Sequence, residues 1–146
     1  MKIIKLLLKD PRVDPSAMDN DSLIISCSKG QTEIVKLLLK DPRVDPSTKN
    51  NECIRRACSC GHMEIVKLLL NDPRLDPSAM DNNCIRYAST YGHTEIVKLL
   101  LDDPRVDPSE MDNECIRHAS SRGYTEIVNL LISDERVDPS AIVKIV

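Results

Sequence analysis

Cys53, Cys58, Cys60 and His62 are the residues whose types and spacing come closest to a known chemistry, the binding of zinc. They form the pattern C-x4-C-x-C-x-H, and three Cys with one His are an established set of zinc ligands. The spacing argues against a metal site, because Cys53 and Cys58 would point about 140° apart on a helix that turns ~100° per residue. We therefore expect no bound metal and no cofactor.

Patterns that indicate catalysis are missing from the sequence. It contains no nucleophile motif, no phosphate-binding loop and no paired carboxylates that stand out. His118 is the one residue around which a triad could be imagined, and no motif supports it. We expect a protein that is not an enzyme.

The composition of the 146-residue chain narrows the classes of partner. Its net charge is −3 with mixed signs, which does not indicate a nucleic-acid partner. No stretch approaches the ~18 apolar residues of a membrane span, because Lys5 and Lys9 interrupt the apolar N-terminus. Six cysteines without a secretion signal indicate a reducing compartment, so we expect a cytoplasmic protein.

Most of the sequence recurs with a fixed period. The four glycines of the chain lie at intervals of 31 residues: Gly30, Gly61, Gly92 and Gly123. Such a period indicates one structural unit stacked on copies of itself, in which neighbouring copies cover each other's apolar faces. Cys53 recurs in this register as Cys84 and Cys115, which indicates that it is a small core residue.

Each repeat predicts two short helices and a connecting loop. In residues 81–111, the Asp and Asn residues at 81–83 are strong N-cap residues for a first helix. Gly92 ends that helix, since glycine adopts a left-handed conformation at little steric cost. A second helix of about residues 94–101 follows, and Pro104 stops it.

The register predicts the domain organisation. We expect an all-α helix-turn-helix solenoid in one domain, 1–146, with four full helix pairs and an N-terminal single helix. Its parts are a partial repeat 1–18, repeats of about 19–49, 50–80, 81–111 and 112–140, and a tail 141–146. The tail is neither a polar cap nor a further repeat, whereas solenoids normally need polar caps. We therefore expect either an excerpt of a longer array or end-to-end self-association through uncapped ends.

The run A-S-x-x-G-H-x-E-I-V-K-L-L-L at residues 88–101 strongly resembles an ankyrin repeat, whose usual pattern is T-P-L-H-x-A-A-x-x-G-H-x-x-I-V-x-L-L-L-x-x-G-A-D-x-N. The resemblance covers essentially the whole chain and implies a protein-binding fold without chemistry. It also implies that the histidine after the glycine, here His62 and His93, braces the turn. Repeats of this length are similar to those of ankyrin-rich proteins from large amoeba-infecting DNA viruses or protists, which would place a viral protein in the host cytoplasm.

The departures from the family pattern concern the loops. The T-P-L-H positions read Asn83-Cys84-Ile85-Arg86 in one repeat, so the family's Thr–His hydrogen bond cannot form there. The turn G-A-D-x-N is replaced by D-P-R-V-D-P-S. We expect the β-hairpin finger of the family to be blunted.

Arginines recur in every repeat, in the loop and in the first helix. They could form a basic ladder for an acidic partner. Each loop arginine lies in D-P-R-x-D, or D-E-R-x-D in the last repeat, which favours salt bridges that brace the loop. The loop arginines are Arg12, Arg43, Arg74, Arg105 and Arg136, and those of the first helices are Arg55, Arg86 and Arg117.

Positions whose residue differs from repeat to repeat are the candidate binding residues. Packing between repeats constrains the core residues, whereas the surface residues are free to vary. The resemblance implies that residues just before each glycine, and their neighbours, face a concave groove. The expected concave-face residues are Lys29, Cys60, Tyr87, Tyr91, His118 and Arg122, and the expected loop-edge residues are Met18, Lys49, Met80 and Met111. Tyr and Arg are frequent interface anchors, and Met adapts to irregular partners.

We thus predict a non-catalytic protein–protein interaction module that binds a partner protein through its concave face. Two alternatives stay open: a structural segment of a longer array without a binding site of its own, and a zinc-binding variant. Drift on an unselected surface would also explain the variable positions.

Overall fold

The computed structural model describes residues 2–142, and helices are its regular elements. In chain order they are α1 (Lys2–Lys9), α2 (Ala17–Ser28), α3 (Thr32–Leu38), α4 (Thr48–Cys60), α5 (Met63–Leu70), α6 (Ala79–Tyr91), α7 (Thr94–Leu101), α8 (Glu110–Ser121), α9 (Thr125–Ile132) and the short 3₁₀ helix η1 (Pro139–Ala141). No strand occurs within residues 2–142.

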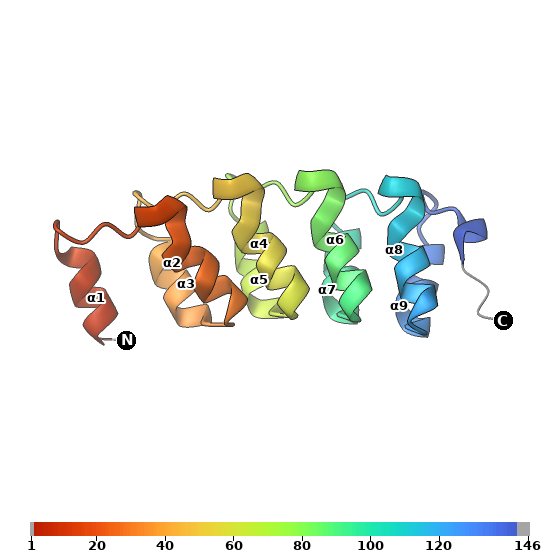
Figure 1. Cartoon of the computed structure of the whole chain (residues 1–146), viewed down its shortest axis with the longest axis horizontal. Coiled ribbons are helices and arrows are strands. Elements are labelled where there is room, and N and C mark those ends of the chain that lie inside the picture. The colour runs from red at the N-terminus through yellow and green to blue at the C-terminus, as the bar shows by residue number, and fades with distance from the viewer. Residues whose placement is uncertain (1, 143–146) are drawn as a thin grey trace. The chain divides into compact units, whose positions relative to one another are not determined.

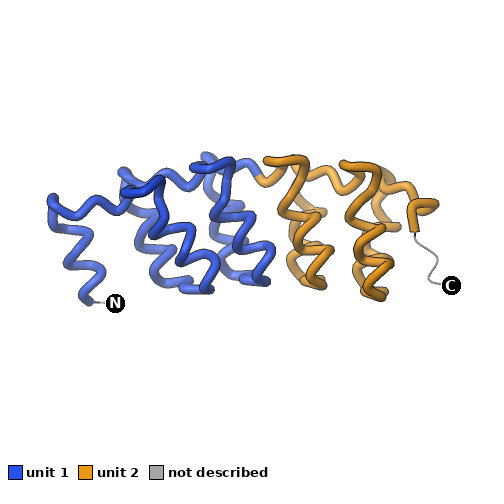
Figure 2. The backbone as a smooth tube through the Cα atoms, in the orientation of Figure 1, with its two compact units in different colours: residues 1–76 blue, residues 77–146 orange. Residues whose placement is uncertain are grey.

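The chain divides into two compact units, residues 1–76 and 77–146 (Figure 2). In unit 1, the first helices α2 and α4 pack against each other, and each packs on its own second helix, α3 or α5 (Figure 1). In unit 2, α6 and α8 pack in the same way, on α7 and α9. The predicted all-α arrangement of four helix pairs and an N-terminal single helix is confirmed.

The core consists of aliphatic and small side chains, which lie on the facing sides of the two helices in each pair. On α6, four residues at helical spacing are all buried: Cys84, Ile85, Ala88 and Ser89. On α7 the buried residues are Ile96, Val97 and Leu100. Neither helix alone exceeds the length at which isolated helices become stable in water, so packing between layers stabilises both.

Gly30 shows why glycine recurs at the end of the first helix. Its φ of +69° lies in the left-handed region, and a Cβ there would lie 2.7 Å from Cε1 of His62. Nε2 of His62 lies 2.9 Å from the carbonyl oxygen of Ser28, so the histidine bridges two repeats. The turn-bracing role expected for His62 is confirmed.

Each first helix opens with three consecutive residues in the left-handed helical conformation, which the sequence analysis did not predict. These left-handed turns are Met18–Asn20, Lys49–Asn51, Met80–Asn82 and Met111–Asn113, with φ between 52° and 62°. A residue other than glycine loses ~1–2 kcal/mol in this conformation, and Asn and Asp tolerate it best. Residues 81 and 82, predicted as N-caps, therefore belong to a turn that precedes the right-handed helix.

The asparagine that ends each left-handed turn bonds to the loop that follows the second helix of the same repeat. Oδ1 of Asn82 accepts a hydrogen bond from the backbone N–H of Asp107 at 2.7 Å, where an N-cap would accept one from its own helix. The same bond joins Asn20 to Asp45, Asn51 to Asp76 and Asn113 to Asp138, at 3.0, 2.9 and 2.8 Å. A stack of such bonds holds the loops where the family usually has a hairpin.

The loop arginines brace the loops, as predicted. Arg74 donates two hydrogen bonds to Asp72, at 2.9 and 2.6 Å, and these bonds lower the pKa of Asp72. Its Nη1 also donates to the carbonyl oxygen of Val44 in the preceding repeat, at 3.0 Å. Arg12, Arg43, Arg105 and Arg136 form the same ion pair with the aspartate two residues before them.

Candidate functional site

Tyr87 and Tyr91 lie on α6, and His118 and Arg122 lie on α8 or at its C-cap. The helix α6 packs beside α8, and Tyr91 and Arg122 hold equivalent positions in consecutive repeats, so we treat these four residues as one candidate set. We call them the first-helix surface. The Tyr91 side chain is 55% exposed, and its ring centroid lies 6.2 Å from that of Tyr87.

Arg122 is exposed, and its backbone N–H donates to the carbonyl oxygen of His118 at 3.2 Å. Within residues 2–142, its guanidinium forms no ion pair, whereas Arg105 and Arg136 of the same unit each hold an aspartate. The Arg122 side chain therefore contributes a charge to the surface without a role in bracing the fold.

A polar network lies beside these residues. Nδ1 of His118 is 2.7 Å from Oγ1 of Thr90, and Nε2 is 3.3 Å from a carboxylate oxygen of Glu114. The other oxygen of Glu114 lies 2.5 Å from Nη2 of Arg86, and both side chains are only 18% exposed. That last contact is an ion pair without the geometry of a hydrogen bond. The network joins α6 to α8 and holds the His118 ring in place.

The contacts of His118 with Thr90 and Glu114, and of Glu114 with Arg86, were not predicted from the sequence. One signal was present, because Glu114 and His118 lie four residues apart and so share a helix face. The contacts of Arg86 and Thr90 cross from one repeat to the next, and local spacing carries no signal for them.

Thr90, His118 and Glu114 stand in the order hydroxyl, imidazole, carboxylate that hydrolases use. Two features make the arrangement structural. Thr90 lies inside α6, where the backbone N–H groups bond within the helix, so these N–H groups are not free to bind an oxyanion. Glu114 is already neutralised by Arg86. The arrangement orders side chains between two helices.

In unit 1, the equivalent positions hold small or flexible side chains. Lys29 is the exposed C-cap residue of α2, and Cys60 is the exposed last residue of α4. Sγ of Cys60 lies 3.7 Å from Oγ of Ser59. Because the three tyrosines of the chain lie in the second half of the sequence, unit 1 offers no aromatic anchor.

The expected loop-edge residues are the first residues of the four left-handed turns. Met18 is 78% exposed, and Met80 and Met111 are each 50% exposed. Nζ of Lys49 lies 3.1 Å from a carboxylate oxygen of Asp21. These residues lie at the N-terminal ends of the first helices, whereas Tyr91 and Arg122 lie at the C-terminal ends, so the structure does not bring the two predicted sets together.

The cysteines and histidine considered for zinc have separate roles. Cys53 and Cys58 are buried, Cys60 is exposed, and the His62 ring bonds to Ser28. Sγ of Cys53 donates to the carbonyl oxygen of Pro46 at 3.0 Å. Within residues 2–142, no group of three or more His, Cys, Asp or Glu side chains is placed to hold a metal ion.

Buried thiols elsewhere in the core are held neutral. Burial raises the pKa of Cys115 to about 12, and contact with Cys53, together with burial, raises the pKa of Cys27. These side chains act as small core residues, as the recurrence of Cys53, Cys84 and Cys115 predicts.

Three findings bear on the class of protein. Across residues 2–142, no helix has the length and apolar character that a membrane span requires. No curated protein matches the chain. The family model described as ankyrin repeats (3 copies) matches residues 1–81 and again residues 55–142. Ankyrin repeats are generally protein–protein interaction modules, and proteins built from them are typically non-catalytic. These matches together span nearly the whole sequence, and they show that the chain belongs to the ankyrin repeat family.

Proposed function

We propose that this chain binds a partner protein through the first-helix surface of unit 2, without catalysing a reaction. Two observations support the proposal: Tyr91 is exposed, and Arg122, at the equivalent position of the next repeat, has no ion-pair partner within residues 2–142. Tyr and Arg are the side chains that most often dominate binding energy at interfaces.

Preorganisation supports the same surface. Thr90, Glu114 and Arg86 hold the His118 ring between α6 and α8, so little side-chain freedom is left to lose on binding. Lys29 and Cys60 are separate proposed contacts in unit 1, and Met80 and Met111 form the proposed loop edge of unit 2. The net charge of −3 supports a protein over a nucleic acid as the partner, and the six thiols support the cytoplasm as its location.

The competing proposals are a purely structural segment and end-to-end self-association. Exposed apolar side chains support self-association: Ile3 is 72% exposed on α1, although its equivalent Ile65 on α5 is fully buried. Sedimentation of the purified chain over a dilution series measures whether it associates.

The binding proposal is tested with the double variant Tyr91→Ala and Arg122→Ala. A partner is captured on the wild-type chain, identified by mass spectrometry, and its Kd is then measured for each variant. Truncating two interface anchors typically costs ~2 kcal/mol or more, so we expect the Kd to rise by about thirtyfold or more. Surface substitutions usually change stability by ~0.5 kcal/mol or less, so melting should hardly shift.

The matched control is Glu64→Ala with Lys67→Ala, which removes an exposed ion pair on α5. This control should bind the partner as the wild type does. Normal binding by the Tyr91 and Arg122 variant would reject the first-helix surface. The loop edge would then be tested with Met80→Ala and Met111→Ala. A chain with no specific partner would favour the structural segment.

A further inference from the structure

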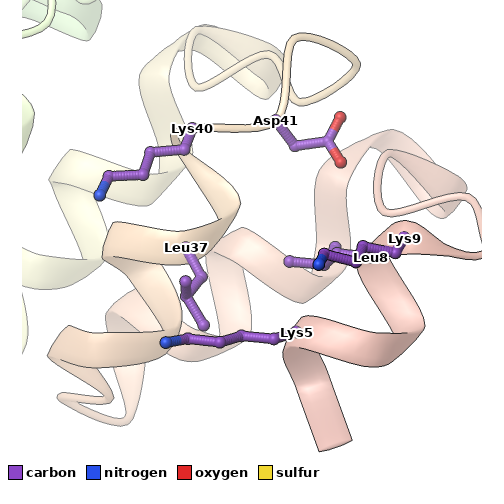
Figure 3. A pocket seen from close by; sticks show the side chains of 6 residues that line it. All are labelled: Lys5, Leu8, Lys9, Leu37, Lys40 and Asp41. Carbon is purple, nitrogen blue, oxygen red and sulfur yellow. The ribbon is translucent and has the colours of Figure 1, made fainter. Parts of the chain in front are cut away.

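A second surface of different chemistry lies between α1 and α3 in unit 1. A cleft of about 390 Å³ is lined there by Lys5, Leu8, Lys9, Leu37, Lys40 and Asp41, which we call the lysine cleft (Figure 3). Figure 3 shows the Lys5 side chain extending from α1 toward α3, beside Leu37. The cleft is thus lined by three lysines, two leucines and one aspartate.

The lysines of this cleft are not used by the fold. Lys5, Lys9 and Lys40 form no ion pair with any residue in 2–142, and the two neighbouring aspartates are held by their own loop arginines: Asp10 by Arg12 and Asp41 by Arg43. Glu33 is bonded to Lys36 at 2.7 Å. The charge of Lys36 lowers the pKa of Glu33, and the charges of Lys5 and Lys40 lower it further.

The repeat itself supplies a comparison, because every position has an equivalent in unit 2. Lys9 and Lys40 correspond to Asp102 and Ser133. Lys98, the equivalent of Lys5, is bonded to Glu95 and Glu126, at 2.8 and 3.2 Å. Lys5 has no such partner on its own helix, because Lys2 replaces the glutamate. The fold therefore does not require lysines at positions 9 and 40.

We propose that the lysine cleft binds an acidic segment of a partner protein that also carries an aliphatic side chain. The two leucines provide an apolar contact and the three lysines provide positive charge, which suits an extended ligand with several carboxylates. A nucleic acid is disfavoured because the aromatic residues that stack on bases are absent from unit 1.

The test uses a rhodamine-labelled peptide, Glu-Glu-Leu-Glu-Glu-Leu-Glu-Glu, and a matched peptide in which every Glu is Gln. Binding to the full chain is followed by fluorescence anisotropy. Exposed ion pairs are individually weak, so we expect the acidic peptide to bind about tenfold more tightly than its neutral match. The difference should shrink as salt rises above about 0.1 M. Equal affinity for the two peptides would overturn the proposal.

Two exchange variants locate the binding. Lys9→Asp with Lys40→Ser gives unit 1 the residues of unit 2, and we expect the affinity to fall about fivefold. Asp102→Lys with Ser133→Lys gives unit 2 the residues of unit 1 and should strengthen binding. Lysines near helix C-termini also stabilise the helix dipole, but that role changes melting and leaves peptide affinity unchanged.

Unchanged affinity in the first variant would overturn the proposal. If that variant fails to fold by circular dichroism, unchanged affinity in the second variant would do so. Vesicles of phosphatidylserine and phosphatidylcholine, and an oligothymidine, serve as the other anionic probes. Tighter binding of either one than of the peptide, lost in the same variant, would replace the acidic segment with a lipid or a nucleic acid.

Discussion

Replacing Asn82 measures what the left-handed turn and its bond to the next loop contribute to the stability of unit 2. Oδ1 of Asn82 accepts from the backbone N–H of Asp107 at 2.7 Å, and Asn82 itself has a φ of 56°. The side chain is 5% exposed, so water cannot readily take over the bond. Two effects, one of the hydrogen bond and one of the backbone, can therefore be separated.

Asn82→Ala removes both effects. Losing the acceptor of a partly buried N–H costs ~1–2 kcal/mol, and alanine in the left-handed conformation costs ~1–2 kcal/mol more, which makes about 2–4 kcal/mol. Asn82→Gly loses the bond but tolerates the conformation, so only the first cost, about 1–2 kcal/mol, remains. At roughly 3 °C of Tm per kcal/mol, we expect decreases of about 6–12 °C for Ala and 3–6 °C for Gly.

The measurement is urea and thermal unfolding followed by far-UV circular dichroism. Asn129→Ala serves as the control, because Asn129 is exposed on the right-handed helix α9 and its loss should change stability by ~0.5 kcal/mol or less. Equal destabilisation by Ala and Gly would refute the backbone cost. A change in neither variant would refute the role of the bond between Asn82 and the next loop.

Two further predictions concern the turns and the loops. Gly30→Ala should lower the free energy of unfolding by about 1 kcal/mol or more in excess of the decrease caused by Gly123→Ala. Both glycines have a positive φ, but of the two only Gly30 would place a Cβ against the His62 ring. Thermal unfolding of the two variants tests this difference. Hydrogen bonds from the loop arginines lower the pKa values of three aspartates: Asp72 by Arg74, Asp103 by Arg105 and Asp134 by Arg136. The contribution of these bonds to the free energy of unfolding is complete above the unfolded pKa of about 3.9. It is lost as the pH falls through the lower pKa values of the folded state. The urea concentration at the unfolding midpoint should therefore fall as the pH is lowered below that value, and it should fall less steeply in Asp72→Asn. An equal dependence of the midpoint on pH in the wild type and in Asp72→Asn would contradict the assignment.

Local sequence determined the helix pairs. The second helix predicted at about 94–101 is α7. Its signals are local, because the apolar residues at helical spacing, the preceding glycine and the following proline all lie within a few residues of one another. The register of the glycines then extended this result to every repeat. The salt bridges of the D-P-R motif are also local, since only two residues separate the arginine from its aspartate.

Tertiary structure decided the left-handed turns and the contacts between repeats. Asp81 and Asn82 have the composition of an N-cap, and local preference alone does not distinguish a cap from a left-handed turn. The bond from Asp107, in a loop 25 residues away, favours the turn. The sequence likewise identified Tyr91, His118 and Arg122 as positions that break the repeat. The contacts of His118 with Thr90, and of Glu114 with Arg86, depend on how two helices pack, because each bond joins side chains whose distance is set by the stack and not by their spacing in the chain.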